Sequence, residues 1–227
     1  MKAIIMSAGR GKRLRPITDS LPKPMVTVGE KPLIQRHIEA LKQAGISEIV
    51  INLGHLGSKI RNALGNGQQF GVNIAYTYET QLLEVGGGIA NALPLLGSSP
   101  FIVVNGDIWT DYNFLSLKNR TIDLGHVVLV PNPQHHLNGD YGLIENEKMV
   151  LNNNIKTYTY SGIALYHPQL FENISGVQMM KPILDEAISR AKISGELYRG
   201  RWADIGTITR LQTLRQCVVD CSAFRTN

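Results

Sequence analysis

The sequence MKAIIMSAGRGKRLRPITDSLPKPM, residues 1–25, contains the strongest local signals for the fold. Ala3 to Met6 is a short apolar run, typical of a buried strand, and a loop with two glycines and four cations follows it at once. Gly9 and Gly11 can expose backbone N–H groups at close range, and the cations can neutralise a polyanion. The cations are Arg10, Lys12, Arg13 and Arg15. This loop therefore predicts phosphate binding.

A further cation, Lys23, lies between two prolines, which restrict the backbone on either side of it. Two common phosphate motifs do not fit this stretch. The P-loop requires Ser or Thr after Gly-Lys, where Arg13 stands here. The dinucleotide-binding fingerprint requires a third glycine at the position of Leu14.

The stretch closely resembles the signature of the sugar-1-phosphate nucleotidylyltransferases, an apolar strand followed by Ala-Gly-x-Gly-x-Arg-Leu-x-Pro and then by Lys-Pro. Here the pattern runs from Ala8 to Pro16, with Lys23-Pro24 after it. A basic surface turn would explain the glycines and the cations, but not their spacing. The resemblance implies that this stretch and two later segments bind a nucleoside triphosphate. The implied nucleotide-binding residues are Ala8, Gly9, Arg10, Gly11, Lys12, Arg13, Lys23, Gly86, Gly87 and Asn105.

Composition narrows the possible partners. A net charge of +5 over 227 residues fits an enzyme that handles phosphates or a weak nucleic-acid binder. The cations gather in the loop and around Arg199 and Arg201, without a long basic tract, so we expect no nucleic-acid partner.

Cys217 and Cys221 have no histidine nearby at metal-ligand spacing, which indicates free thiols in a reducing compartment. Because the sequence has no apolar run of membrane-spanning length and no signal peptide, we expect a cytoplasmic protein without a membrane partner.

Elements alternate after the loop. Lys31 to Gly45 and Leu56 to Leu64 suit helices, whereas Glu48 to Asn52 and Val72 to Tyr78 suit strands. This order predicts parallel strands with helices on both faces, and ligands at the carboxyl ends of the strands. We therefore expect an α/β fold. It would be a single Rossmann-like domain with a central mixed, mainly parallel sheet flanked by helices, plus a small β-rich sugar-binding part.

Glu84 to Ala90 contains three consecutive glycines before an apparent helix through Leu93. Composition alone indicates a flexible turn. Alternatively, the missing side chains let the backbone lie flat against a nucleobase, and the resemblance favours this role for Gly86 and Gly87. The family usually has Gly-Thr-Ala here, so the sequence does not determine which nucleobase is bound.

Phe101 to Val104 is an apolar strand that ends in Asn105-Gly106-Asp107. An acidic residue at the tip of a buried strand is well placed to hold a cation in a cleft, although it could instead cap a helix starting near Asp111. In the family, the aspartate of this motif holds Mg²⁺. Trp202 to Thr207 resembles a second family motif, which implies Asp204 as the second Mg²⁺ ligand.

From Gly125 the pattern becomes β-rich. The predicted strands lie at residues 126–131, 141–145, 149–151 and 156–166. Within the single domain of residues 1–227, we expect residues 1–124 to bind mainly the nucleotide and residues 125–215 mainly the sugar. A final helix is expected from Thr207 through Cys217, and residues 216–227 are expected to form a tail.

The sugar contacts follow from the resemblance and from charge. Most relatives carry Glu-Lys-Pro between these strands, but Asn152 to Lys156 has no such triplet. Arg199 or Arg201 could bind a carboxylate on the sugar, and His135-His136 is interpreted as a solvated loop. The expected sugar-binding residues are Gly139, Asp140, Gly142, Ser161, Gly162, Arg199 and Arg201.

The resemblance implies attack by a sugar 1-phosphate oxygen on the α-phosphorus of a nucleoside triphosphate, giving a nucleotide-sugar and pyrophosphate. It assigns catalysis to Arg13, Lys23 and Asp107, with Mg²⁺ held by Asp107 and Asp204. The short form of the chain most resembles the N-acetylmuramate 1-phosphate uridylyltransferases of cell-wall recycling, which use UTP. Mannose-1-phosphate guanylyltransferase and glucose-1-phosphate thymidylyl- or uridylyltransferase are alternatives. A non-catalytic nucleotide-sugar sensor and a nucleic-acid-binding module are alternatives of another class.

Overall fold

The computed structural model describes residues 1–151 and 155–223. Its strands are β1 (Lys2–Met6), β2 (Thr27–Val28), β3 (Lys31–Pro32), β4 (Glu48–Leu53), β5 (Asn73–Tyr78), β6 (Phe101–Asn105), β7 (Ile108–Thr110), β8 (Gly125–Val130), β9 (Tyr141–Ile144), β10 (Lys148–Val150), β11 (Thr157–Tyr166), β12 (Ile193–Leu197) and β13 (Trp202–Asp204). Its α-helices are α1 (Ile17–Ser20), α2 (Leu33–Gln43), α3 (Gly57–Leu64), α4 (Glu84–Leu96), α5 (Leu115–Lys118), α6 (Met180–Ser189) and α7 (Ile208–Ala223). Short 3₁₀ helices are η1 (Lys12–Leu14), η2 (Lys23–Met25), η3 (Gln68–Phe70) and η4 (Pro168–Phe171).

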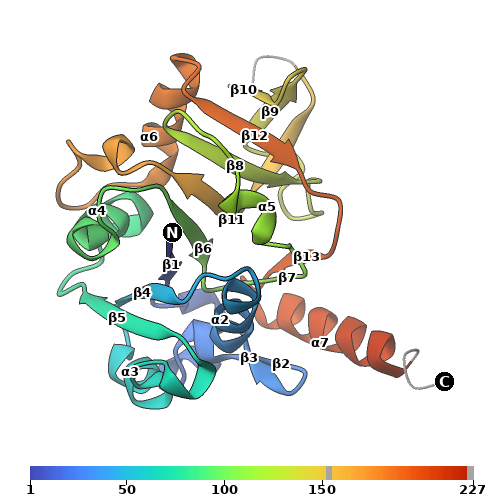
Figure 1. Ribbon diagram of the computed structural model, residues 1–227. Coiled ribbons are helices and arrows are strands. Elements are labelled where there is room, and N and C mark those ends of the chain that lie inside the picture. Colours follow the sequence, from blue (N-terminus) through green and yellow to red (C-terminus); the bar gives the residue numbers. More distant parts are fainter. Residues whose placement is uncertain (152–154, 224–227) are drawn as a thin grey trace.

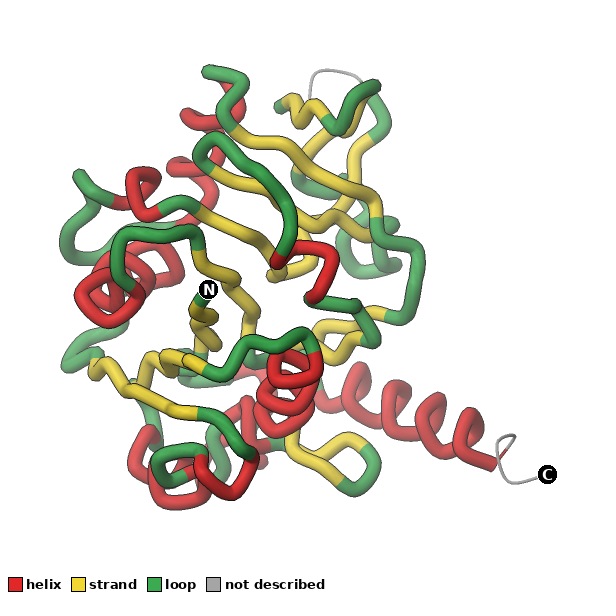
Figure 2. Tube along the Cα trace, in the orientation of Figure 1, coloured by secondary structure: helices red, strands yellow, loops and turns green. Residues whose placement is uncertain are grey.

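Among the described residues, nine strands form one sheet through the whole molecule, with helices on both of its faces (Figures 1 and 2). The order across the sheet is β5-β4-β1-β6-β11-β8-β12-β10-β9. β5, β4, β1 and β6 are parallel. From β1, the chain adds β4 and then β5 on one side of the sheet, and then returns to add β6 on the other side of β1. The direction in which strands are added therefore reverses between β1 and β6. Ligands bind at such a reversal in α/β sheets, beyond the carboxyl ends of the strands.

The second half of the sheet is mostly antiparallel. β11 pairs antiparallel with both β6 and β8, and β9 and β10 form a hairpin. The expected mixed sheet is confirmed, although its parallel part is concentrated in the first half. The β-rich part continues the same sheet. β12 lies parallel to β8, in a stretch where Ser194, Gly195 and Glu196 interrupt the apolar pattern and the sequence predicts no strand.

The strands bury side chains on both faces. Ala3 and Ile5 of β1 face the core formed with α2 and α3, whereas Ile4 faces the core formed with α4 and α6. Because neighbouring strand residues point to opposite faces, a one-residue register shift would exchange these side chains between the cores. Burying each isoleucine contributes about 1.5–3 kcal/mol, which fixes the position of β1 and of the loop that follows it.

Two elements differ from the sequence-based expectation. α4 begins at Glu84, so the three glycines lie inside the helix and do not form a turn before it. α7 extends to Ala223, beyond the expected end at Cys217, so residues 216–223 of the expected tail are helical. Residues 224–227 of that tail lie outside the described part of the chain.

α7 packs its first half against a small third core and then projects from the rest of the molecule (Figure 1). Leu211 and Leu214 are buried against Val26 and Val28, next to β2. Cys217 is exposed with a free thiol. Across the described ranges, no helix combines the length and the apolar character needed to cross a bilayer.

Candidate active site

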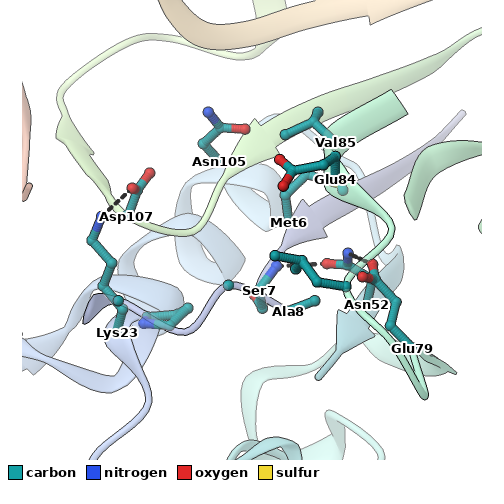
Figure 3. Close-up of a pocket in the computed structure, with 14 residues that line it drawn as sticks. Met6, Ser7, Ala8, Lys23, Asn52, Glu79, Glu84, Val85, Asn105 and Asp107 are labelled. Carbon is teal, nitrogen blue, oxygen red and sulfur yellow. Dashed lines mark hydrogen bonds and ion pairs between the residues drawn. The ribbon is translucent and has the colours of Figure 1, made fainter. Parts of the chain in front are cut away.

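The loops after β1 and β6 meet where the strand order reverses. The Gly106 N–H donates to the Met6 carbonyl over 2.9 Å, and this contact joins the two loops. Beside it lies a cavity of about 210 Å³, called the first cavity here, drawn in Figure 3. Its lining is Met6, Ser7, Ala8, Gly9, Gly11, Lys23, Pro24, Asn52, Glu79, Leu82, Glu84, Val85, Asn105 and Asp107.

The floor of the first cavity is a chain of hydrogen bonds that is buried at Ser7 and Asn52 and half-buried at Glu79. Asn52, at 2% exposure, accepts from the Ser7 N–H over 2.5 Å and donates to Glu79 Oε1 over 2.6 Å (Figure 3). Glu79 Oε2 accepts from the Leu83 N–H over 2.9 Å. The network therefore ties the loop after β1 to the segment that leads into α4.

The glycine loop has the geometry of an anion-binding turn. Gly11 has a φ of +61°, and its carbonyl accepts from the Thr18 hydroxyl over 2.9 Å. A Cβ at Gly11 would stand 2.8 Å from Thr18 Cγ2, so the position excludes other residues. Gly9 is exposed, with open space where a side chain would be. Backbone N–H groups of such a loop can approach a phosphate closely.

Asp107 and Asp204 come together although they are far apart in the sequence. β7 and β13 form an antiparallel pair in which Asp204 stands opposite Ile108, and the Ile205 N–H donates to the Asp107 carbonyl over 2.9 Å. Both aspartates line a second cavity of about 360 Å³. The lining of the second cavity is Arg13, Asn105, Asp107, Ile108, His135, His136, Thr159, Tyr160, Ser161, Trp202, Asp204 and Arg210. Asn105 and Asp107 line both cavities and form their shared wall.

Cations accompany both carboxylates. Lys23 pairs with Asp107, and its side chain is only 13% exposed (Figure 3). Arg210 pairs with Asp204, whose Oδ1 lies 3.0 Å from His135 Nε2. These pairs keep the two negative charges compensated inside a cleft, where uncompensated charge is costly.

The two aspartates suit a hard divalent cation. Such ions prefer one or two carboxylates together with phosphate oxygens. Asn105 adds a buried amide oxygen that lacks a hydrogen-bond partner in the described part of the chain. A group of three or more His, Cys, Asp or Glu side chains at metal-binding distance is absent from that same part. The oxygen donors of Asp107, Asp204 and Asn105 fit a hard divalent cation.

A buried histidine lies behind this site. His37 in α2 is 3% exposed, and burial lowers its pKa from 6.5 to about 4. Contact with the Ile108 backbone and the charge of Asp107 both raise the pKa, but less strongly. His37 is therefore neutral at pH 7 and supports β7 as a packing residue.

A bulge in β11 forms the far side of the second cavity. The pairing of β11 with β8 shifts between Tyr160 and Ile163, and Gly162 there has a φ of +81°. The Ser161 hydroxyl donates to the Val128 carbonyl over 2.7 Å, and the Trp202 indole donates to the Ser161 carbonyl over 2.8 Å. The bulge thus holds Ser161 and Trp202 together at the cavity.

A sequence profile of the nucleotidyl transferase family matches residues 2–219. The match covers nearly all of the described residues and includes both cavities. The chain belongs to this family.

Known relatives agree with this assignment. The nucleotidyl transferase is 44% identical to the N-acetylmuramate alpha-1-phosphate uridylyltransferase of Neisseria meningitidis, over 93% of this chain and 96% of that protein. It is 26% identical to a UTP--glucose-1-phosphate uridylyltransferase of Synechocystis, over 92% of this chain but only 61% of that protein. A Bacillus anthracis structure in complex with sucrose, provisionally described as a glucose-1-phosphate thymidylyltransferase, shares the fold with a TM-score of 0.83 and 24% identity. That comparison covers 96% of this chain and 94% of the other.

The structure of this nucleotidyl transferase brings part of the expected site together. Ala8, Gly9, Gly11, Lys23 and Asn105 line the first cavity. Outside it, Arg13 lines the second cavity, Arg10 lines a neighbouring hollow with His55, and Lys12 is exposed.

The turn predicted around Gly86 and Gly87 requires a correction, while their role in nucleotide binding stays a prediction. The two glycines lie in α4 against residues 176–179, where the Gly87 N–H donates to the Gln178 carbonyl over 3.0 Å. A Cβ at Gly87 would stand 2.1 Å from the Gly176 carbonyl oxygen. These glycines therefore allow a close approach of two backbones, and the turn expected to carry a nucleobase is replaced by a helix.

Of the expected sugar-binding residues, some lie at the second cavity and others lie away from it. Ser161 lines the second cavity, and Gly162 lies directly behind Asn105. Asp140 accepts from the Tyr160 N–H over 2.8 Å and contacts His136 at 3.0 Å, so it anchors the histidine loop.

Gly139 and Gly142 pack against neighbouring side chains. A Cβ at Gly139 would stand 2.6 Å from Asn132, and one at Gly142 would stand 2.2 Å from Ile155. Arg199 is exposed, and Arg201 lines a separate groove along α7. Asn152, Asn153 and Asn154, where the Glu-Lys-Pro triplet is missing, lie outside the described residues.

Several lining residues are not predicted by the sequence. Asn52, Glu79 and Arg210 belong to this group, and His135 was expected in a solvated loop. The position of Asn52 at the end of a buried strand is a usable signal, since β4 ends at the same edge as β1. Arg210 offers no such signal, because it resembles any cation on a surface helix.

Proposed function

We propose that this nucleotidyl transferase moves a nucleotidyl group from a nucleoside triphosphate to a sugar 1-phosphate. The observation that carries the proposal is the wall of Asn105 and Asp107 shared by the two cavities. Two substrates bound on either side of this wall would meet at Asp107. The most specific form of the proposal is UTP with N-acetylmuramate 1-phosphate, supported by the Neisseria meningitidis relative that matches over nearly its whole length.

The first cavity would hold the triphosphate. We assign the β- and γ-phosphates to the amides of Gly9 and Gly11 together with Arg13, and the α-phosphate side to Lys23. Lys23 lines the first cavity and pairs with Asp107, whereas Arg13 lines the second cavity beside the shared wall, from where it would have to reach the phosphates. Held cations of this kind stabilise charge that develops during phosphoryl chemistry.

The reaction needs no protein nucleophile, because the phosphate oxygen of the sugar phosphate is already ionised at neutral pH. A bond forms between that oxygen and the α-phosphorus, while the bond from the α-phosphorus to the bridging oxygen of the leaving group breaks. The electron pair leaves with pyrophosphate. The residues around Asp107 therefore act by aligning two polyanions and by compensating their charge.

Mg²⁺ is the proposed cofactor, with Asp107 and Asp204 as its protein ligands. When bound, it would supply positive charge to the phosphate oxygens of both substrates. The pairing of β7 with β13 supports this assignment, because it sets the two aspartates on adjacent strands. A reaction that consumes UTP also agrees with the expected cytoplasmic location.

Pyrophosphate release over a grid of substrates tests the proposal. UTP, dTTP, GTP, CTP and ATP would each be combined with the 1-phosphates of N-acetylmuramate, N-acetylglucosamine, glucose and mannose. We expect the strongest Mg²⁺-dependent signal for UTP with N-acetylmuramate 1-phosphate. A signal for GTP with mannose 1-phosphate would retain the chemistry and replace the substrates. Silence across the grid with folded protein would contradict the proposal and favour a sensor or a nucleic-acid-binding module.

A further inference from the structure

Arg210 occupies a position between two cavities. It lies in the first turn of α7, and its side chain is 23% exposed. It lines the second cavity and also a groove of about 890 Å³ along α7, which Trp109, Arg201 and Leu214 help to form. Asp204, His135 and Trp202 line both spaces as well. Arg210 therefore stands where the second cavity borders the α7 groove.

The guanidinium is held in place by its surroundings. Its Nη1 pairs with Asp204 and lies 2.9 Å from His135 Nε2. A Cβ at Gly206 would stand 2.5 Å from Nη2 and 2.6 Å from Cζ, so the group lies across a residue without a side chain. The contacts of Arg210 with Asp204 and His135 both use Nη1, and Nε and Nη2 carry the N–H groups that an acid group would bind. Arginine binds phosphate and carboxylate through such paired N–H groups.

The charges of the second cavity require a cation in this position. Among the described residues of its lining, Arg13 and Arg210 are the permanent cations, against the carboxylates of Asp107 and Asp204. A sugar 1-phosphate would add further negative charge to this space. Arg13 belongs to the same loop as Gly9 and Gly11 of the first cavity, whereas Arg210 comes from α7 and lines the second cavity and the α7 groove, so we assign Arg210 to the sugar phosphate. The sequence suggested Arg199 and Arg201 for this role, but Arg199 is exposed and Arg201 lines the α7 groove.

We propose that Arg210, with His135 beside it, binds an acid group of the sugar phosphate. The inference rests on the proposed function and names the residue that selects for an acidic second substrate. The acid group is either the 1-phosphate, which all candidate sugars share, or a carboxylate carried on the sugar, which N-acetylmuramate has. In both cases the contact is a paired ionic hydrogen bond from the guanidinium.

The test compares Arg210→Ala with Arg215→Ala. Arg215 lies on the same helix and contacts the Thr27 backbone at 3.0 Å, away from both cavities, so its loss controls for damage to α7. KM would be measured for UTP, for N-acetylmuramate 1-phosphate and for N-acetylglucosamine 1-phosphate. Calorimetric titration of each sugar phosphate in EDTA would give binding without metal or turnover. Arg210→Lys would show whether charge alone is sufficient, because lysine cannot make the paired contact.

We expect Arg210→Ala to raise the KM for N-acetylmuramate 1-phosphate at least tenfold and to weaken its binding in EDTA, while the KM for UTP changes less than twofold. An equal loss of affinity for both sugar phosphates would identify the 1-phosphate as the group that Arg210 binds. A loss confined to N-acetylmuramate 1-phosphate would identify the carboxylate. Arg210→Lys should recover part of the affinity, and Arg215→Ala should match the wild type.

Unchanged binding of both sugar phosphates to Arg210→Ala would overturn the inference. A parallel rise in the KM for UTP would also overturn it, because Arg210 would then act by positioning Asp204. Failure of the proposed function would look different, since the wild type itself would release no pyrophosphate with any pair of substrates. Gly206→Ala gives a second variant that keeps the charge and displaces the guanidinium, and we expect it to raise the same KM.

Discussion

Replacing Asn52 with leucine tests whether the floor of the first cavity positions the glycine loop after β1. Leucine has nearly the same size but can neither accept from the Ser7 N–H nor donate to Glu79. A buried donor left without a partner costs about 1–3 kcal/mol, and the lost hydrogen bond to a carboxylate costs about 1.5–3 kcal/mol. We therefore expect Asn52→Leu to lower the free energy of unfolding by about 3–5 kcal/mol, allowing for partial relaxation.

Urea denaturation measures this change, and the KM for the nucleotide reports on the loop. Asn73→Leu is the matched control, because Asn73 makes the same amide-to-carboxylate contact with Glu48 at 2.7 Å on the exposed surface. The control should cost less than about 1 kcal/mol. If Asn52→Leu costs no more than the control and leaves the nucleotide KM at the wild-type value, the floor does not position the loop.

The remaining predictions concern the supports of the site. His37 has a pKa of about 4 when folded and 6.5 when unfolded, so the unfolded state gains its proton first as pH falls. Stability should therefore decrease between pH 6.5 and 4 by up to about 3 kcal/mol, and His37→Gln should flatten this slope in urea titrations. Gly162→Ala should lower the free energy of unfolding, measured by thermal denaturation, by at least about 1–2 kcal/mol. It should cost more than Gly97→Ala, which has a similar φ of +86° but open space for a Cβ. Arg199→Ala and Arg201→Ala should each leave the KM for the sugar phosphate within twofold of the wild type, and a larger change would place that arginine in the sugar site.

The glycine loop after β1 and the two aspartates could be singled out from the sequence as candidates, because each stands in a short characteristic run of residues. Gly11 adopts the positive φ that a glycine-rich turn indicates. Asp107 follows β6, and the four apolar residues of this strand, Phe101 to Val104, are all buried. The meeting of the glycine loop with Asp107 follows from the parallel strands of the first half, which the alternation of strands and helices predicts. Asp204 joins them through the antiparallel pair of β13 with β7.

The hydrogen bonds of Asn52 and the contact of Arg210 with His135 could not be predicted, because these partners are remote in the chain. Asn52 contacts Ser7 across 45 positions, and Glu79 acts only through the fold that brings it beneath α4. The glycines of α4 show the opposite problem. Their local composition indicates a turn, but Gly87 lies in a helix whose backbone touches residues 176–178.

The account is tested most directly by pyrophosphate release from UTP and N-acetylmuramate 1-phosphate with Mg²⁺, using Asp107→Asn and Asp204→Asn. Loss of one preorganised charge-stabilising group typically costs about 100- to 1,000-fold in kcat. We predict that both variants fold like the wild type and that each loses at least this much activity. If either variant retains activity within about tenfold of the wild type, the two aspartates do not form one metal site, and the proposed chemistry is contradicted.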